Sequence, residues 1–436
     1  MTFRSRILLD RWLAIPASIV CNIVARVLGR VLRRDHSLDS ARSREIVVCK
    51  LVGLGSVLQS TPLVRALKQR FPEARLTYLT LESNRALVAR LENVDEVLCL
   101  DDSGAVRMAW TTLRALAALT RRRVDHYFDL EVYSGFACML SLFSLARNRL
   151  GFYRHSSRYK RGIYTHLVYF NTRMPVRKIY LQLGRVAGAD IGEDDSLSGI
   201  RIEREERGRL HEKLSALGLK QGDPYVLVNP NASDLLIERR WPMAYMAEAV
   251  GRLARLGNNI VLMGSPAEAR FVSELYEQIA EPVRERIFNT AGRLSLVEAF
   301  TLIEGAACVL TNDTGPMHMA LALRRPTVCL FGPVDPEHYG MEGPGIVTLY
   351  APVPCSPCVH EIDEAPCQGK NFCMQRLLPD LVVTRVVALL KWASDPARSA
   401  DTLQTEGSVR LPLVWEDEAG MPLGIVVRDS LDAHGH

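Results

Sequence analysis

The sequence lacks an uninterrupted apolar run long enough to cross a bilayer. The segment that comes nearest runs from Trp12 to Val31 and is broken by Pro16, Asn22 and Arg26. A spanning helix needs about 20 predominantly apolar residues, and a charged side chain near its centre is costly. The segment also has no small-residue cleavage site after a short apolar core, so it fits a secretory signal poorly. Both a membrane span and a removed signal peptide are therefore disfavoured.

The chain also lacks a general excess of positive charge. Its formal net charge is +5, but residues 1–44 carry nine arginines and three aspartates, a net of +6, so the rest of the chain sums to −1. The basic character therefore belongs to the N-terminal extension, and no nucleic-acid partner is expected. With 436 residues, 48% of them apolar, the chain is long enough for two hydrophobic cores.

Residues 1–44 are predicted to form an amphipathic helix and a linker at a membrane surface. An in-plane helix would place its apolar side chains among acyl chains and its guanidinium groups at anionic headgroups. The apolar positions are Trp12, Ile15, Ile19, Ile23, Val27 and Val31, and the basic ones are Arg26, Arg30, Arg33 and Arg34. A helix packed on the protein's own surface is the alternative interpretation.

Six of the ten cysteines are scattered, mostly within apolar runs such as IVVCKL, and indicate small buried hydrophobes in a reducing compartment, the cytosol. The other four have the spacing C-x2-C-x8-C-x5-C and surround His360; they are Cys355, Cys358, Cys367 and Cys373. Four thiolates would close a structural zinc site, with two disulfides or free thiols as the alternatives. A catalytic metal is not expected, because four thiolates leave no open coordination position.

Strand-like apolar segments alternate with helix-like segments in two series, one opened by EIVVCKL and the other by YVLVNP. This alternation predicts two doubly wound parallel sheets with right-handed crossovers, an α/β architecture. We predict an N-terminal Rossmann-like domain over 45–195, a polar linker over 196–222 and a C-terminal Rossmann-like domain over 223–395. A cleft between the C-terminal ends of the two sheets would bind ligands. In the tail, 396–436, the turn signal DEAG favours a hairpin.

The stretch TNDTGPMHMALA combines an acid, a hydroxyl and a histidine directly after an apolar strand. A helix that opens at Thr314 and Gly315 would offer unpaired N–H groups and the positive end of its dipole to a diphosphate. Asp313 would accept hydrogen bonds from sugar hydroxyls, and His318, one turn into the helix, would reach a phosphate or sugar oxygen. An ordinary Asp/Thr helix cap with a chance histidine is the alternative.

Three further motifs accompany this stretch: RRWP at 239–242, GSPAE at 264–268 and FGPVDP at 331–336. With them the chain resembles glycosyltransferase family 9, the lipopolysaccharide heptosyltransferases and their relatives, over roughly residues 45–390. The donor-site pattern Asp-Thr-Gly-x-x-His, followed by Gly-Pro-x-Asp-Pro, is present in the family's order. It consists of Asp313, Thr314, Gly315, His318, Gly332, Pro333, Asp335 and Pro336. The segment CKLVGLGSVLQSTPLVRALKQRFP is similar to the strand, turn and helix that open the family's acceptor domain.

The resemblance implies a GT-B fold and inverting, metal-independent sugar transfer without a cofactor. The donor would be a nucleotide-diphosphate sugar such as ADP-heptose, and the acceptor a cell-envelope glycolipid such as lipopolysaccharide core. One carboxylate would deprotonate the acceptor hydroxyl while positive groups stabilise the departing diphosphate. Arg239 stands where the family often has a lysine in the second role. The implied donor-binding residues are Asp313, Thr314, Gly315, His318, Gly264 and Glu268.

One position departs from the family pattern. The usual first turn ends Gly-Asp, and its aspartate is the family's candidate base, whereas this chain has Gly55 and Ser56. Losing a general base typically costs about two to four orders of magnitude in rate. Glu131, at the end of the strand YFDLEV, is the candidate replacement. The alternatives are a carboxylate that merely binds a sugar or an arginine, an acceptor whose own phosphate or carboxylate assists, and a non-catalytic nucleotide-sugar-binding protein of the same fold.

The acceptor side is predicted to include Lys50, Gly55 and Ser56, although Lys50 would otherwise be an ordinary solvated lysine. A basic and aromatic stretch suits an anionic glycolipid, with a solvated loop as the alternative. Its basic residues are Arg147, Arg149, Arg154, Arg158, Lys160 and Arg161. Together these features predict a peripheral enzyme on the cytoplasmic face of the plasma membrane, held beside a lipid-linked acceptor.

Overall fold

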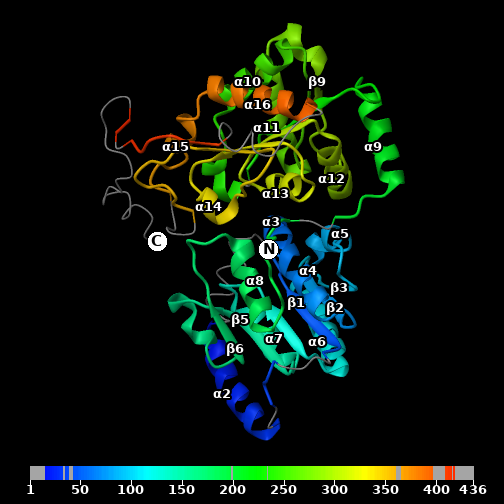
Figure 1. Cartoon of the computed structure of the whole chain (residues 1–436), viewed down its shortest axis with the longest axis vertical. Coiled ribbons are helices and arrows are strands. Elements are labelled where there is room, and N and C mark those ends of the chain that lie inside the picture. The colour runs from blue at the N-terminus through cyan, green and yellow to red at the C-terminus, as the bar shows by residue number, and fades with distance from the viewer. Residues whose placement is uncertain are drawn as a thin grey trace. The chain divides into compact units, whose positions relative to one another are not determined.

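Each half of the chain builds its own parallel β-sheet with helices on both faces (Figure 1). The computed structural model describes residues 15–32, 35–38, 43–197, 200–232, 234–359, 365–395, 408–414 and 416–417. The chain divides into two compact units, Met1–Arg201 and Ile202–His436. The prediction of two doubly wound α/β units is confirmed.

The first unit contains six strands in the order β3-β2-β1-β4-β5-β6, and every neighbouring pair is parallel. The strands are β1 Glu45–Cys49, β2 Arg75–Leu81, β3 Glu96–Leu100, β4 His126–Asp129, β5 Asn148–Tyr153 and β6 His166–Tyr169. The chain begins at the centre, winds outward to β3 and returns past β1 to β4. This Rossmann order leaves a switch point between the carboxyl ends of β1 and β4, where such sheets bind ligands.

Helices cover both faces of the first sheet. Helix α4 packs against α8 on one face, while α7 contacts both α6 and α2 on the other, as right-handed crossovers from a central first strand require. The helices are α2 Ile15–Leu32, α3 Leu54–Gln59, α4 Thr61–Arg70, α5 Arg85–Val88, α6 Ala105–Arg122, α7 Gly135–Phe143 and α8 Val176–Val186, with 3-10 turns η2 Glu82–Asn84 and η3 His155–Lys160.

Helix α2 lies within the predicted N-terminal helix and is packed along one face only. Cys21 and Ala25 are buried against Cys138 and Leu142 of α7. The Asn22 amide donates to the Tyr159 carbonyl at 2.6 Å and so anchors the helix to η3. The packed-helix interpretation therefore describes this face. Trp12, Arg33 and Arg34 lie outside the described residues, and in the part of the chain that is described no helix has the length and apolar character to span a membrane.

The second unit repeats the same winding with seven parallel strands in the order β13-β12-β11-β10-β7-β8-β9. They are β7 Tyr225–Asn229, β8 Asn259–Leu262, β9 Ile287–Asn289, β10 Cys308–Asn312, β11 Thr327–Phe331, β12 Ile346–Tyr350 and β13 Val409–Arg410. The first strand, β7, is again central, so the switch point of this sheet lies between β7 and β10.

The helices of the second unit are α9 Arg204–Ala216, α10 Met243–Arg255, α11 Ala269–Gln278, α12 Leu296–Gly305, α13 Gly315–Ala322, α14 Pro336–Tyr339, α15 Phe372–Gln375 and α16 Pro379–Ser394, with 3-10 turns η4 Asp234–Arg239, η5 Pro266–Glu268 and η6 Glu281–Arg286. Helix α9 lies inside the predicted linker. It packs on α12 through the ion pairs Arg207–Glu304 at 2.6 Å and Lys213–Glu298 at 2.8 Å. That segment is therefore part of the second unit rather than a plain connection.

In the tail, β13 adds an edge strand parallel to β12, and its register pairs Leu349 with Val409. Most of the segment for which a hairpin was predicted, from residue 418 onward, lies outside the described residues.

Gly151 offers a test of packing in the first unit. An added Cβ there would lie 2.6 Å from a ring carbon of Tyr164, so Gly151→Ala should lower the free energy of unfolding by about 1–3 kcal/mol. Gly208→Ala is the matched control, because no atom lies within 4 Å of the added methyl. Because Gly208 lies within α9, and alanine is more favourable than glycine in a helix by about 1 kcal/mol, Gly208→Ala should not lower the free energy of unfolding. Urea denaturation of both variants checks this; equal changes would contradict it.

Candidate active site

A buried polar cluster lies at the switch point of the second sheet, where β7 and β10 end. The Asn229 amide donates to the Thr314 hydroxyl at 2.9 Å and to the Thr311 hydroxyl at 3.0 Å. The Asn312 amide donates to the carbonyls of Pro230 and Asn231 at 3.0 and 3.1 Å. These bonds fix the loop after β7 to the end of β10 and hold Thr314 in place.

Asp313 and Arg239 form an incompletely bonded pair within this cluster. Arg239 Nε lies 3.7 Å from Asp313 Oδ2, and Arg239 Nη1 donates to the Asp313 carbonyl at 3.4 Å. Burial raises the pKa of the Asp313 carboxyl, and the Arg239 charge counteracts only part of that shift. Neither Asp313 Oδ2 nor Arg239 Nε has a hydrogen-bond partner among the described residues. Buried polar atoms are normally bonded, so this pair is suited to a polar ligand.

Helix α13 begins beside this pair. Thr314 is its N-cap residue, with an extended backbone, and Pro316 stands in the first turn. The first N–H groups of a helix and its dipole favour an anion. His318 is buried one turn into the helix. The structure thus brings Arg239, Asp313, Thr314 and Gly315 together at one sheet edge.

Two glycines shape the neighbouring loops. A Cβ on Gly264, after β8, would lie 2.9 Å from Asn231 Nδ2, and one on Gly332, after β11, would lie 2.8 Å from Cys373 Sγ. Gly264 thus lets its loop lie close to Asn231, and Gly332 lets its loop lie close to the start of α15. The Glu268 carboxylate accepts the Ser265 N–H at 2.7 Å and caps η5, so in this structure it stabilises its own loop.

A second charged pair lies at the switch point of the first sheet. Glu131 Oε1 accepts three hydrogen bonds, from Lys50 Nζ at 2.7 Å, Leu51 N at 2.8 Å and Val52 N at 3.0 Å. Burial alone raises the pKa of Glu131, but Lys50 and the two N–H groups outweigh it, and the net pKa is lowered. Lys50 is only 6% exposed, which excludes the solvated-lysine interpretation.

A buried network supports this pair from behind. The Tyr164 hydroxyl donates to Asp129 Oδ2, and the Glu131 N–H donates to Asp129 Oδ1 at 2.9 Å. Burial raises the pKa of Asp129 to about 6. Lys160, 1% exposed, donates to the carbonyls of Glu131 and Val132, both at 2.9 Å. Lys160 therefore holds the end of β4 and is not a surface contact for an acceptor, which corrects that prediction.

The family model described as glycosyltransferase family 9 (heptosyltransferase) matches residues 113–368, more than half of the chain. The chain belongs to this family. It is therefore a glycosyltransferase. It is 25% identical over 291 residues to lipopolysaccharide heptosyltransferase 2 of Salmonella typhimurium, a match that covers 65% of this chain and 81% of that relative.

A shorter match is closer in sequence: the chain is 36% identical over 100 residues to lipooligosaccharide heptosyltransferase 2 of Haemophilus influenzae, covering 23% of this chain and 29% of that relative. Among solved structures, the E. coli ADP-heptose lps heptosyltransferase II superposes with a TM-score of 0.66 at 22% identity, over 80% of this chain and 100% of that one. This likeness shows that the fold is GT-B.

In this family 9 transferase, Gly55 and Ser56 lie in the first turn of α3, directly after the loop that Glu131 holds. Ser56 is half-buried. Gly53, with φ of 91°, starts the helix in a backbone region that favours glycine. The tight turn is therefore present without the family's aspartate.

Only part of the predicted basic stretch remains available to an acceptor. Arg149 donates to the carbonyls of Ile163 and Ala146, and Arg147 donates to the carbonyl of Asp35. These arginines therefore serve the fold of the transferase. Arg154 stacks on the Tyr133 ring at 5.4 Å. The exposed members are Arg158 and Arg161.

The spacing of the four clustered cysteines predicts a structural zinc site. All ten cysteines of the transferase are free thiols, so neither disulfide is present. Among the described residues, no three His, Cys, Asp or Glu side chains are placed to hold a metal ion; His360 lies outside them. Burial raises the pKa of the Cys358 thiol to about 12. Because His360 and residues 361–364 of this loop lie outside the described part of the chain, the structural zinc site stays a prediction.

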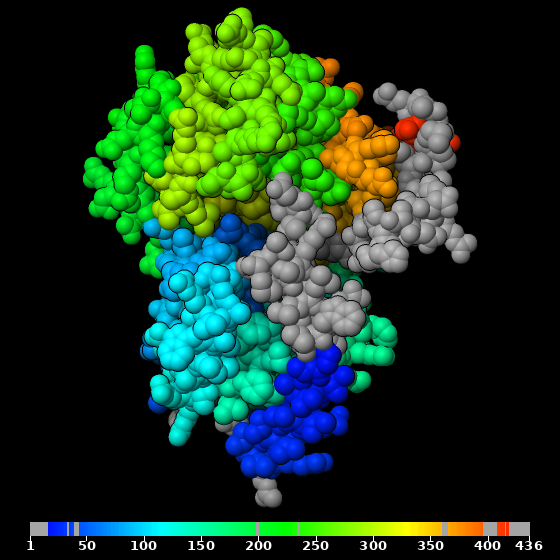
Figure 2. Space-filling model, turned by 180° about the vertical axis from the view of Figure 1, so that it is seen from behind, coloured from blue at the N-terminus to red at the C-terminus, as the bar shows by residue number. Residues whose placement is uncertain are grey.

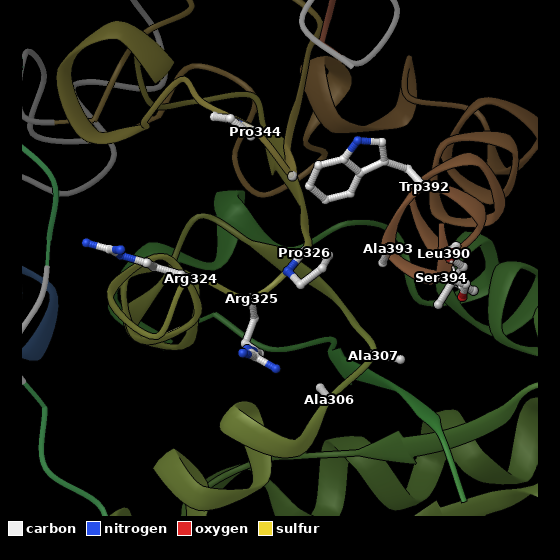
Figure 3. Close-up of a pocket in the computed structure, with 11 residues that line it drawn as sticks. Ala306, Ala307, Arg324, Arg325, Pro326, Pro344, Leu390, Trp392, Ala393 and Ser394 are labelled. Atoms are coloured by element: carbon white, nitrogen blue, oxygen red, sulfur yellow. Dashed lines mark hydrogen bonds between the residues drawn. The ribbon is translucent and has the colours of Figure 1, made fainter. Parts of the chain in front are cut away.

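A pocket of about 400 Å³ lies at the opposite edge of the second sheet, before β10, β11 and β12. Figure 3 shows Trp392 and Pro326 facing its centre, while Arg324 points away from them. The Asp313 cluster lies at the carboxyl ends of the same strands, so this pocket is not part of the candidate site.

The Lys50–Glu131 pair yields a prediction for stability. Lys50→Met should lower the free energy of unfolding by about 3–5 kcal/mol, because it leaves a buried carboxylate unpaired. Lys50→Met/Glu131→Gln should recover most of that loss. The lowered pKa of Glu131 means that the pair's contribution is present above the ordinary pKa of 4.5 and is lost as pH falls through the folded value.

Urea denaturation at neutral and acid pH measures both effects as a double-mutant cycle. A double variant no more stable than Lys50→Met, or an equal acid response in all four proteins, would contradict the pairing.

Proposed function

We propose that this transferase moves a heptose from ADP-heptose to a lipopolysaccharide core acceptor at the cytoplasmic face of the plasma membrane. The observation that carries the proposal is the Asp313–Arg239 pair, buried and incompletely bonded beside the first turn of α13. Two similarities support the choice of substrates. The match to the Salmonella lipopolysaccharide heptosyltransferase covers most of that relative's length. The E. coli enzyme of the same fold is named for ADP-heptose.

On the donor side, charge is supplied by the protein alone. The N–H groups at the start of α13 and the Arg239 guanidinium would bind the diphosphate and stabilise the negative charge that develops as it leaves. Asp313 Oδ2 would accept a hydrogen bond from a sugar hydroxyl, and His318 would reach a phosphate or sugar oxygen. These groups would make a metal ion unnecessary for holding the diphosphate.

On the acceptor side, Glu131 is the proposed base. Its lowered pKa keeps the carboxylate ionised at neutral pH, which is the form a base requires. The acceptor hydroxyl becomes strongly acidic as its oxygen bonds to the sugar, so a weakly basic carboxylate suffices at that stage. The bonds from Lys50, Leu51 and Val52 all converge on Oε1, so Oε2 would take the proton.

The second candidate function is a non-catalytic nucleotide-sugar-binding protein. Ser56 at the family's aspartate position is the feature that favours it. In that case Glu131 would only hold the loop between β1 and α3.

Donor binding can be measured by titration calorimetry. Arg239→Met should weaken ADP binding by about tenfold or more, because it removes a charge-assisted hydrogen bond. Asp313→Asn should weaken ADP-heptose binding more than ADP binding, because its partner is on the sugar. Arg270→Met is the charge-matched control, since that side chain is 91% exposed. Equal effects of all three variants would remove the support for this donor site.

Turnover distinguishes the two functions. ADP release with a lipopolysaccharide core acceptor should fall by about two orders of magnitude or more in Glu131→Gln, while the Kd for ADP-heptose stays unchanged. Retention of most of the rate would assign Glu131 to loop support alone. Tight donor binding by the unaltered protein, with no ADP release across several acceptors, would favour the binding protein.

A further inference from the structure

Helix α6 exposes an apolar stripe. Val106, Trp110 and Leu113 are 84%, 61% and 63% exposed, and their spacing puts them on one face of the helix. The opposite face places Ala115 and Leu119 in the core against the sheet. A helix that covers a sheet normally has a polar outer face; α6 is apolar on both.

Helix α2 likewise has one buried face and one exposed apolar face. Its packed face lies on α7, as described above. On the other side Ile19, Ile23, Val27 and Val31 recur every fourth residue and are between 52% and 71% exposed. Grouped apolar side chains of this size on a protein surface indicate an interaction site.

The two helices that carry these stripes lie on the same side of the first unit. Helices α6 and α7 share one core cluster over the sheet, and α2 packs on α7. Figure 2 shows the blue atoms of α2 and the cyan atoms of α6 on one side of that unit. We define the α2–α6 surface by its outer side chains, Ile19, Ile23 and Val27 of α2 and Val106, Trp110 and Leu113 of α6.

The charge of both helices has one sign. Neither the α2 sequence IPASIVCNIVARVLGRVL nor the α6 sequence AVRMAWTTLRALAALTRR contains an acidic residue. The basic residues are Arg26 and Arg30 in α2 and Arg107, Arg114, Arg121 and Arg122 in α6. Arg122 pairs with Glu96 of β3, and Arg107 Nη1 lies 3.8 Å from Asp101 Oδ2, so Arg26, Arg30, Arg114 and Arg121 are the arginines available to headgroups. Apolar side chains flanked by arginines match the two layers of an anionic bilayer surface, acyl chains and headgroups.

We propose that the α2–α6 surface docks on an anionic lipid bilayer, with both helices in the plane of the interface. Helix α6 is a second attachment element that the N-terminal pattern did not reveal. Two elements matter because one weak anchor gives only reversible, marginal binding. The benefit of docking rests on the proposed function, in which the acceptor is lipid-linked, but the docking itself is measured without turnover.

Vesicle flotation of the full-length protein tests the surface. Vesicles of phosphatidylethanolamine and phosphatidylglycerol should carry the protein upward, less so at high salt, whereas pure phosphatidylcholine should not. Trp110→Gln/Leu113→Gln and Ile23→Gln/Val27→Gln should each weaken partitioning by about tenfold or more. Leu256→Gln is the control, since Leu256 is also 63% exposed but lies in the second unit; it should change partitioning by less than about twofold.

Two further measurements distinguish insertion into the bilayer from a loss of catalytic activity. Lipids brominated on the acyl chains should quench the fluorescence of Trp110, so the quenched part of the protein's tryptophan fluorescence should be smaller in Trp110→Phe than in the unaltered protein. Both double variants should retain ADP release with a delipidated core acceptor and lose it when the core is carried on its lipid in vesicles.

Vesicle binding that the α6 double variant leaves unchanged would overturn the role of α6. An unaltered protein that fails to float, and whose dimer the α6 double variant splits in light scattering, would show that this surface binds a second copy. Flotation without any ADP release would leave docking in place and count against the proposed transfer alone.

Discussion

The architecture of each unit depends on one topological constraint. A parallel sheet whose first strand lies at its centre, wound with right-handed crossovers, must reverse direction between two adjacent strands. At that point the loops after the two strands separate onto opposite faces, and polar side chains at the strand ends lie together below them. The reversal between β1 and β4 positions Lys50 and Glu131, and the one between β7 and β10 positions Asn229 and Asp313.

The buried charged pairs at the two switch points differ in how completely they are hydrogen-bonded. In the first unit the lysine nitrogen and the glutamate oxygen are 2.7 Å apart, and two backbone N–H groups donate further hydrogen bonds to the same carboxylate oxygen. In the second unit the arginine and aspartate are 3.7 Å apart and leave polar atoms without hydrogen bonds. Because an unsatisfied buried polar atom is costly, the second arrangement is the one suited to a ligand that completes it. The first is a preformed support for the loop that leads to Ser56.

Helices α2 and α6 carry apolar side chains on their solvent-exposed faces as well as on the faces that they bury. Both helices already bury one face, so fold stability does not explain the apolar residues on the other. Their side chains face solvent, and the two helices themselves contain arginines but no acidic residue. A lipid surface accounts for both properties at once, and it would bring the transferase to a membrane-borne acceptor.

The sequence by itself determined the positions of several strands and the start of one helix, because apolar patterns and helix caps are local features. The apolar segments EIVVCKL, YFDLEV and YVLVNP located β1, β4 and β7, and Asp-Thr-Gly located the start of α13. The sequence did not reveal β5, because Asn148 and Arg149 open the short segment NRLGFY with polar residues, and only the fold shows that Arg149 bonds to neighbouring carbonyls. Asn229 and Asn231 were also missed, although an Asn-Pro-Asn directly after an apolar strand is a usable signal.

Only the tertiary structure decided which charges are buried and what they contact. Lys50 meets Glu131 across 81 positions of sequence, and Lys160 reaches the end of β4 from 29 positions away. Spacing fixes which residues a helix or strand aligns, but burial, pKa and pairing follow from neighbours that the folded chain alone brings within reach.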